Sequence, residues 1–154
     1  MAVKTAFNNK FQLDFNKPIE ELKQLERSGF IRNLKIKTSS SSNYKRRYFY
    51  FDLAIINLCT PDYSFDYDLS KYAIKIQFGD TPYPLVFCTN IVFQKNTPHI
   101  YHNGALCLYK QANMKWTNEH SISDTLYTWI CTWFYFYEQW LTNGHIWEGP
   151  EAPH

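Results

Sequence analysis

The stretch from Leu126 to Leu141 most constrains the fold, because it carries large apolar side chains on almost every face of a predicted helix. The apolar positions in and just before this stretch are Ile122, Leu126, Trp129, Ile130, Trp133, Phe134, Phe136, Tyr137, Trp140 and Leu141. A helix that is apolar on most faces has to be buried on most faces. We therefore expect that either the C-terminal tail, His145–His154, or a partner protein wraps over it.

Both ends of this helix are marked in the sequence. Ser121 is followed three residues later by Asp124, a pattern that resembles a capping box and predicts that the helix begins there. Gly144 is a natural C-cap, so the helix should end near Thr142. Polar residues such as Glu138 interrupt the stretch, which is shorter than the ~20 mostly apolar residues of a membrane span. We expect no membrane-spanning segment and no membrane partner.

Length, charge and cysteine usage limit the class of protein. The 154 residues fit one domain, 1–154, in which 143–154 form an extended C-terminal tail. The net charge is +2, from 16 basic and 14 acidic residues, so we expect no nucleic-acid partner. The first residues, MAVKTAFNNK, have no apolar signal-peptide core, and the four cysteines form no CxxC pair. These features predict a cytoplasmic protein with reduced thiols.

One further helix and four strands are predicted before residue 94. The helix covers Pro18–Glu26, with Asn16 as its cap and Gly29 as its stop. The strands alternate in polarity or are rich in branched and aromatic residues, and they cover Ile31–Lys37, Tyr48–Leu58, Lys71–Phe78 and Leu85–Phe93. Polar loops are expected at Thr38–Arg47 and Thr60–Ser70. The order predicts an α+β fold with a four-stranded antiparallel meander.

The segment Thr97–Lys110 (TPHIYHNGALCLYK) carries the residues most suited to chemistry. Asn103-Gly104 is a strong turn signal, because both residues tolerate positive φ. The main chain should turn there and present Cys107 just past the bend, with Leu106 and Leu108 anchored inward. A thiol that is held firmly, partly exposed and close to polar groups suits a nucleophile better than a core position.

Other interpretations of these residue types are open. The remaining cysteines lie in strand or helix patterns and are expected to be small core residues, namely Cys59, Cys88 and Cys131. His99, His102 and Cys107 could supply three zinc ligands, but structural zinc usually draws its ligands from paired knuckles, and no second knuckle exists. A Cys-His hydrolase fits the residue types, but no orienting acid lies near the thiol in the sequence. We expect neither a metal nor a cofactor.

The order of elements, together with several short motifs, resembles the ubiquitin-conjugating enzyme (UBC) fold over about residues 10–142. Tyr83-Pro84 stands where that family has a Tyr-Pro pair, and residues 104–108 (GALCL) match its Gly-x-Ile-Cys-Leu context. At the family's His-Pro-Asn-Ile segment the chain has Thr97-Pro98-His99-Ile100, so His99 replaces the asparagine. Trp116 falls where the family has a tryptophan after the cysteine.

The C-terminal half is similar to the stand-alone conjugating enzymes of short type II CBASS antiphage operons in bacteria. The similarity lies in Lys115-Trp116-Thr117, the aromatic helix and the closing segment 147–154 (WEGPEAPH). This resemblance implies a transferase of antiviral defence whose partner is the operon's cGAS-like nucleotidyltransferase, which makes a cyclic-nucleotide signal. It implies that Cys107 forms a thioester with a protein C-terminus, expected to be that of the nucleotidyltransferase, and passes the acyl group to an amine.

The same resemblance suggests roles for other residues. In the family the motif asparagine has an oxyanion-stabilising or structural role. Here that role passes to His99, with Asn103 and His102 as substitutes. The surface expected to bind the partner includes three tryptophans, because aromatic residues are enriched in interface cores. These are Trp133, Trp140 and Trp147.

Two further functions fit the same fold. The protein could conjugate a bacterial ubiquitin-like modifier, or it could be a non-catalytic adaptor that binds the nucleotidyltransferase and leaves its thiol idle. The chain has no GxGxxG or Walker-type segment, so it cannot adenylate a carboxylate itself. Either a separate activating enzyme loads Cys107, or the thiol attacks an acyl group already present in its partner.

Overall fold

The computed structural model describes residues 15–40, 45–59, 64–110 and 114–150. Helices and strands in these ranges are α2 (Asn16–Arg27), β1 (Ile31–Ser40), β2 (Lys45–Leu53), β3 (Ile55–Cys59), β4 (Ser64–Asp68), β5 (Ala73–Phe78), β6 (Leu85–Cys88) and α3 (Leu126–Thr142). A long irregular segment joins β6 to α3 and contains the cysteine stretch. No helix in this part of the chain has the length and apolarity that crossing a membrane requires.

Four antiparallel strands form one sheet in the order β1-β2-β5-β6, which confirms the predicted α+β class and antiparallel sheet. A two-stranded hairpin, β3–β4, is inserted between β2 and β5. Two predictions are therefore wrong. The single strand predicted at Tyr48–Leu58 is broken at Ala54 into β2 and β3, and the loop predicted at Thr60–Ser70 contains β4. The strand-forming composition continues through the break, so composition alone does not reveal it.

Two predicted boundaries in the sheet also need correction. The loop expected at Thr38–Arg47 is largely strand, because residues 38–40 of β1 still pair with residues 45–47 of β2. Only residues 41–44 separate the two strands, and they lie outside the described residues. The fourth predicted strand, Leu85–Phe93, ends as β6 at Cys88.

A bulge in β1 keeps the apolar residues of this strand on one face. Ile31 and Ile36 are an odd number of residues apart, which would place them on opposite faces of a regular strand. The register instead shifts around Asn33, which adopts a φ of 57°. Ile31 therefore pairs with Leu53. Ile36 pairs with Phe49, and both partners are core residues.

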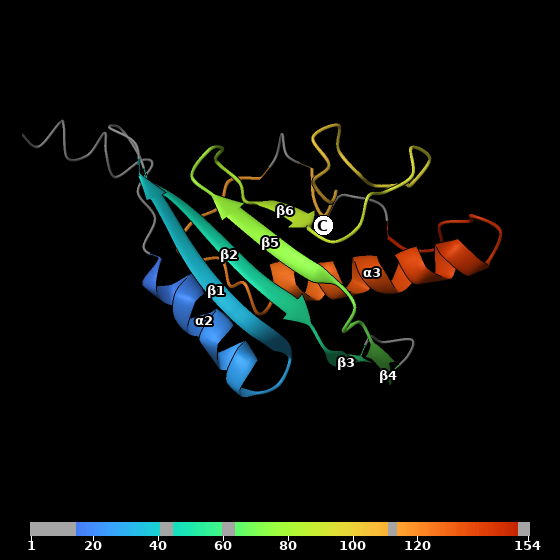
Figure 1. The fold of residues 1–154 in the computed structure, drawn as a ribbon, viewed down its shortest axis with the longest axis horizontal. Coiled ribbons are helices and arrows are strands. Elements are labelled where there is room, and N and C mark those ends of the chain that lie inside the picture. The colour runs from blue at the N-terminus through green and yellow to red at the C-terminus, as the bar shows by residue number, and fades with distance from the viewer. Residues whose placement is uncertain (1–14, 41–44, 60–63, 111–113, 151–154) are drawn as a thin grey trace, which may run out of the picture.

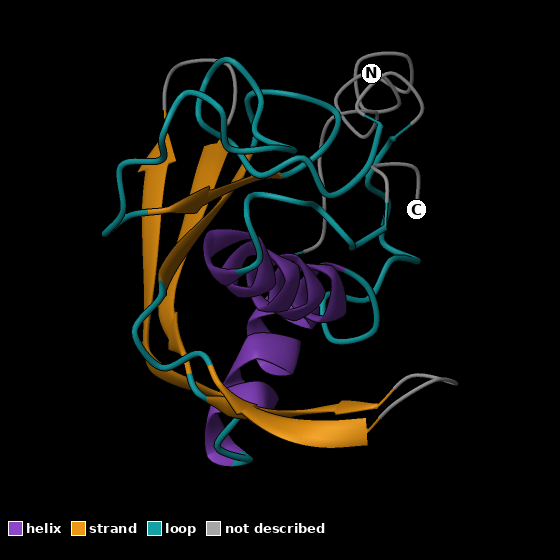
Figure 2. Cartoon of the chain, turned by 90° about the vertical axis from the view of Figure 1, so that its right-hand side faces the viewer, coloured by secondary structure: helices purple, strands orange, loops and turns teal. Residues whose placement is uncertain are grey.

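Both helices cover the same face of the four-stranded sheet (Figure 1; Figure 2). Tyr72, Ile74 and Ile76 are all buried, as alternation along the strand predicted at Lys71–Phe78 requires. They belong to one continuous core that also includes Leu22 of α2 and Phe134 of α3. Lys75 alternates with the two isoleucines and lies on the opposite face of the sheet. Lys71, just before β5, instead reaches Glu138 of α3.

Helix α2 begins slightly earlier than predicted. Asn16 is its first residue rather than its cap, and Phe15 occupies the N-cap position without a side-chain capping bond. Gly29 ends the helix as expected: it adopts a φ of 81°, and its N–H donates to the Glu26 carbonyl at 3.0 Å. The first helix of the sequence analysis is thus confirmed, with a different N-terminal cap.

Helix α3 begins at Leu126, later than the predicted start at Ser121. Part of the expected capping box still forms, because Ser121 Oγ accepts the Asp124 N–H at 3.3 Å, but this bond closes a turn that precedes the helix. At the other end, Asn143 is the C-cap, and Gly144, which was predicted as the cap, follows it with a φ of 84°, a conformation that ends helices.

The tail supplies the cover that the aromatic helix was expected to need. The His145 ring stacks on Trp140 with 4.1 Å between ring centroids. The Trp147 ring lies 5.8 Å from Trp133 and 6.2 Å from Phe136. The described part of the tail therefore packs against α3 through its own aromatic side chains.

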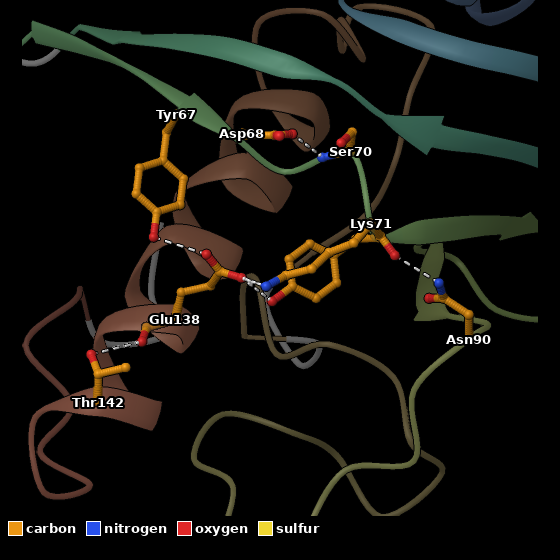
Figure 3. A network of polar contacts seen from close by, with 8 residues as sticks. Tyr67, Asp68, Ser70, Lys71, Asn90, Glu138 and Thr142 are labelled. Carbon is orange, nitrogen blue, oxygen red and sulfur yellow. Dashed lines mark hydrogen bonds and ion pairs between the residues drawn. The ribbon is translucent and has the colours of Figure 1, made fainter.

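One carboxylate on α3 connects the helix to the hairpin and the sheet (Figure 3). Glu138 accepts hydrogen bonds from the hydroxyls of Tyr67 (2.8 Å) and Tyr72 (2.6 Å), and Lys71 Nζ lies 2.5 Å from its Oε2 atom. Burial alone would raise the pKa of Glu138, but hydrogen bonds from Lys71, Tyr72 and Tyr67 together lower it from its ordinary value of 4.5. Burial and the bond to Glu138 raise the pKa of Tyr67 to about 12.

We expect Glu138→Ala to lower the free energy of unfolding at pH 7 by about 2–4 kcal/mol, because it leaves two tyrosine hydroxyls without their acceptor. Glu138→Gln should cost about half of that, since it keeps an acceptor but loses the charge. Because the folded-state pKa is lowered, the contribution of Glu138 is complete above about pH 4.5 and is lost as the pH falls further. Urea denaturation at several pH values measures these effects. The exposed Glu20 provides the control, and Glu20→Ala should stay within about 0.5 kcal/mol of wild type.

Candidate functional site

A short hairpin around Asn103-Gly104 forms the predicted bend before Cys107. Ile100 and Leu106 form an antiparallel bridge, and the Tyr101 N–H donates to the Ala105 carbonyl at 2.9 Å. Gly104 adopts a φ of 87° at the tip, a conformation that glycine reaches without strain. The side-chain oxygen of Asn103 accepts the Ala105 N–H at 3.0 Å and closes the turn.

Cys107 follows this hairpin directly, and the main chain on both sides of it is anchored. Leu106 and Leu108 are 3% and 1% exposed, so they point inward as predicted. The Leu106 N–H donates to the Val86 carbonyl of β6 at 2.8 Å, which attaches the segment to the sheet. The Cys107 thiol is free and partly exposed. These contacts hold one partly exposed thiol in a fixed place.

The carbonyl of His99 joins the cysteine to helix α3. It accepts the Cys107 N–H at 2.8 Å and the indole N–H of Trp133 at 3.3 Å. His99 reaches this position with a φ of 58°, which is uncommon for a residue with a side chain. Its ring lies 4.9 Å from the Trp147 ring of the tail. His99 therefore contacts the cysteine segment, the helix and the tail.

The other predicted site residues are distributed over different environments. His102 and Asn103 are exposed at the hairpin tip, where Asn103 has the turn-forming role given above. Trp133 and Trp140 are only 4% and 3% exposed, so a partner would have to displace the tail to reach them. Trp147, by contrast, is partly exposed. No three His, Cys, Asp or Glu side chains of the described residues gather as metal ligands do.

The remaining described thiols are in less reactive environments. Burial raises the pKa of Cys131 on α3 to about 12. Burial also raises the pKa of Cys88. Hydrogen bonds near Asn90 lower this pKa, but by less than burial raises it. A raised pKa reduces the thiolate fraction, and only the thiolate is an effective nucleophile. The prediction that Cys131 is a core residue is confirmed. Cys88 was also expected in the core, but it is only partly buried. The side chain of Cys59 lies outside the described residues.

A narrow cleft lies beside Cys107. Its volume is about 10 Å³, close to the smallest space that holds one water molecule. Its walls come from the cysteine segment, α3 and the tail, and the lining residues are Cys107, Leu108, Trp129, Thr132, Trp133, Trp147 and Pro150. Trp129, Thr132 and Pro150 were not among the site residues expected from the sequence. Two of these could have been found, because Trp129, Thr132 and Trp133 follow the i, i+3, i+4 spacing of one helix face.

The family of type II CBASS E2 proteins has a model that matches residues 58–154, well over half of the sequence. The chain belongs to this family. The match begins at the end of β3 and includes every residue of the candidate site in this E2 protein. The family expected from the sequence motifs is therefore confirmed. No curated protein and no solved structure matches this E2 protein.

We expect Gly104→Ala to lower the free energy of unfolding by about 1–2 kcal/mol, the cost of a left-handed conformation for a residue with a Cβ atom. Beyond Gly104 and its two chain neighbours, no atom lies within 4 Å of the position that a Cβ would occupy, so this cost is conformational. Gly104→Asn should cost less, because asparagine tolerates positive φ. Urea denaturation measures both variants. Equal costs for alanine and asparagine would show that backbone conformation is not what selects glycine at the bend.

Proposed function

We propose that this type II CBASS E2 protein has a UBC fold and forms a thioester between Cys107 and the C-terminus of its operon's cGAS-like nucleotidyltransferase. The observation that carries the proposal is the position of Cys107. It is a partly exposed thiol, held between two buried leucines directly after a fixed bend. Among the described residues, the order of helix α2, an antiparallel sheet, a cysteine-bearing segment and the long helix α3 supports the fold assignment.

The proposed chemistry is acyl transfer in two covalent steps. The Cys107 thiolate attacks the carbonyl carbon of an acyl group that a separate activating enzyme or the partner has already activated, and the activating group leaves. An amine then attacks the thioester carbon, the new amide bond forms, and the thiol is released. Dividing one difficult substitution into two easier ones is the usual advantage of a covalent intermediate.

Each attack places negative charge on the acyl oxygen, and a hydrogen-bond donor has to stabilise that charge. The Cys107 N–H already donates to the His99 carbonyl, so it is occupied in this structure. We therefore assign the donor role to a side chain near the thiol, with His99 as the first candidate and Asn103 and His102 as substitutes. His99 is supported best, because its carbonyl accepts a hydrogen bond from the Cys107 N–H.

The proposed partner is the nucleotidyltransferase, and conjugation of its C-terminus would regulate cyclic-nucleotide signalling. The support for this partner is membership in the type II CBASS E2 family together with the resemblance to conjugating enzymes of such operons, which implies a nucleotidyltransferase partner. Trp147 is the one partly exposed tryptophan among the three that the sequence analysis assigned to partner binding. An adaptor with the same fold would bind the same partner without using its thiol.

Intact mass spectrometry of the E2 protein purified with the neighbouring operon products tests the proposal. We expect wild type to carry an adduct that hydroxylamine removes, because hydroxylamine cleaves thioesters, and we expect Cys107→Ala to carry none. Cys88→Ala is the matched control, since it removes another partly buried thiol and should keep the adduct. The mass of the adduct identifies the protein that was captured.

The same variants separate a transferase from an adaptor. Phage protection is measured in cells that carry the complete operon with wild type, Cys107→Ala or Cys88→Ala. A transferase loses protection only with Cys107→Ala. Full protection by Cys107→Ala, or an adduct that survives in that variant, would contradict the proposed reaction and favour the adaptor.

Variants of His99 test its role as a donor. His99→Ala should slow amine-dependent loss of the thioester by about 10²-fold or more, the usual effect of removing one oxyanion donor. His99→Asn should keep most of the rate, because asparagine also donates a hydrogen bond and tolerates the observed positive φ. The measurement is single-turnover decay of the purified thioester with added amine, together with a thermal melt. A wild-type decay rate in a folded His99→Ala protein would make His99 purely structural.

A further inference from the structure

Residues 143–150, here called the tail strap, fold back over α3 and are fastened near their start. The side chain of Asn143 accepts the Ile146 N–H at 3.0 Å and donates to the Ile146 carbonyl at 2.9 Å. It also donates to Glu148 Oε1 at 3.1 Å. These bonds form a compact turn that directs the following residues along the helix.

The far end of the tail strap lies at the thiol. Trp147 and Pro150 line the same small cleft as Cys107, and the Trp147 indole N–H donates to the Pro150 carbonyl at 3.3 Å. The Trp147 ring also contacts His99, whose carbonyl accepts the Cys107 N–H. The strap therefore forms one wall of the cleft and contacts the residue that positions the cysteine.

The cleft is too small for the substrate of the proposed reaction. A space of about 10 Å³ accommodates about one water molecule, whereas an acyl donor is the end of a polypeptide. The wall formed by α3 is anchored to the sheet through Glu138 and the core. The tail strap has no strand pairing, and it packs at the edge of the core through Trp147, so its end can leave α3 while the contacts of α3 with the sheet stay in place.

We propose that the tail strap is a gate over Cys107, closed in the free protein, and that docking of the protein substrate displaces its Trp147–Pro150 end. The proposal rests on the proposed function for the identity of that substrate. The gate itself is a property of the isolated chain and can be measured without any partner.

Gly149 offers a way to open the gate without removing a side chain. A Cβ atom built on Gly149 would lie 2.7 Å from the Phe136 ring and 2.9 Å from its Cβ atom, closer than packed atoms approach. Gly149→Ala should therefore push the strap away from α3. Ile146→Ala is the matched control, because Ile146 is 60% exposed, belongs to the same strap and does not line the cleft.

The test measures labelling rates of full-length protein without partners, using N-ethylmaleimide as the small probe and a maleimide on a long polyethylene glycol chain as the bulky one. Peptide mass mapping follows Cys107 and Cys88 separately. Trp147→Ala and Gly149→Ala should raise the bulky-probe rate at Cys107 by about tenfold, as expected for a modest shift between two conformers. The small-probe rate should change by less than about threefold, because the thiol is already partly exposed outside the cleft in the closed conformer. Ile146→Ala should label as wild type does.

Two results would overturn the gate. One is a bulky-probe rate at Cys107 that stays at the wild-type value in both Trp147→Ala and Gly149→Ala. The other is an equal rise for both probes at both Cys107 and Cys88, which indicates general loosening, and a thermal melt identifies it independently. Failure of the hydroxylamine experiment would remove the thioester chemistry and leave these rates unchanged, so the two proposals fail separately.

Discussion

The burial of α3 on more than one side is the constraint on which the rest of the structure depends. Ile130 and Phe134 of this helix are fully buried in the core against the sheet. Trp133 is nearly as buried, but Phe93 and Trp147, from outside the sheet, lie against its ring. An aromatic helix of this kind cannot leave one side to water without a large loss of hydrophobic stabilisation. Segments before and after α3 therefore have to pack on it, and one of them carries the thiol.

The position of the thiol follows from a polar requirement of the same helix. Burial of Trp133 removes its indole N–H from water, and a buried donor needs an acceptor. The acceptor is the His99 carbonyl, which also accepts the Cys107 N–H. A single oxygen thus satisfies the helix and fixes the main chain at the cysteine. The uncommon positive φ of His99 is consistent with strain that such converging contacts compensate.

Local signals in the sequence were sufficient for the bend, the helices and the pattern of β5, because glycine conformations and alternating burial depend on neighbouring residues. The break at Ala54 and the bulge at Asn33 were not predictable, since both serve the pairing of strands distant in the sequence. At the site, the residue types made Cys107 a candidate and the family resemblance made His99 one, but neither pointed to the cleft wall. Pro150 reaches the thiol only because the tail folds back, which depends on tertiary packing rather than on any local motif.

A transferase of the proposed kind faces conflicting demands at Cys107. Its thioester has to be shielded from water, because hydrolysis would waste the activated acyl group, yet a protein terminus has to reach the same sulfur. A wall made only from α3 would meet the first demand and fail the second, since Glu138 and the core hold that helix against the sheet. In the proposed gate, a wall completed by a short strap, fastened by Asn143 and a few ring contacts, opens at its Trp147–Pro150 end while the contacts of α3 with the sheet stay intact. Dividing the wall between a fixed helix and a removable strap therefore allows one site to provide both shielding and access.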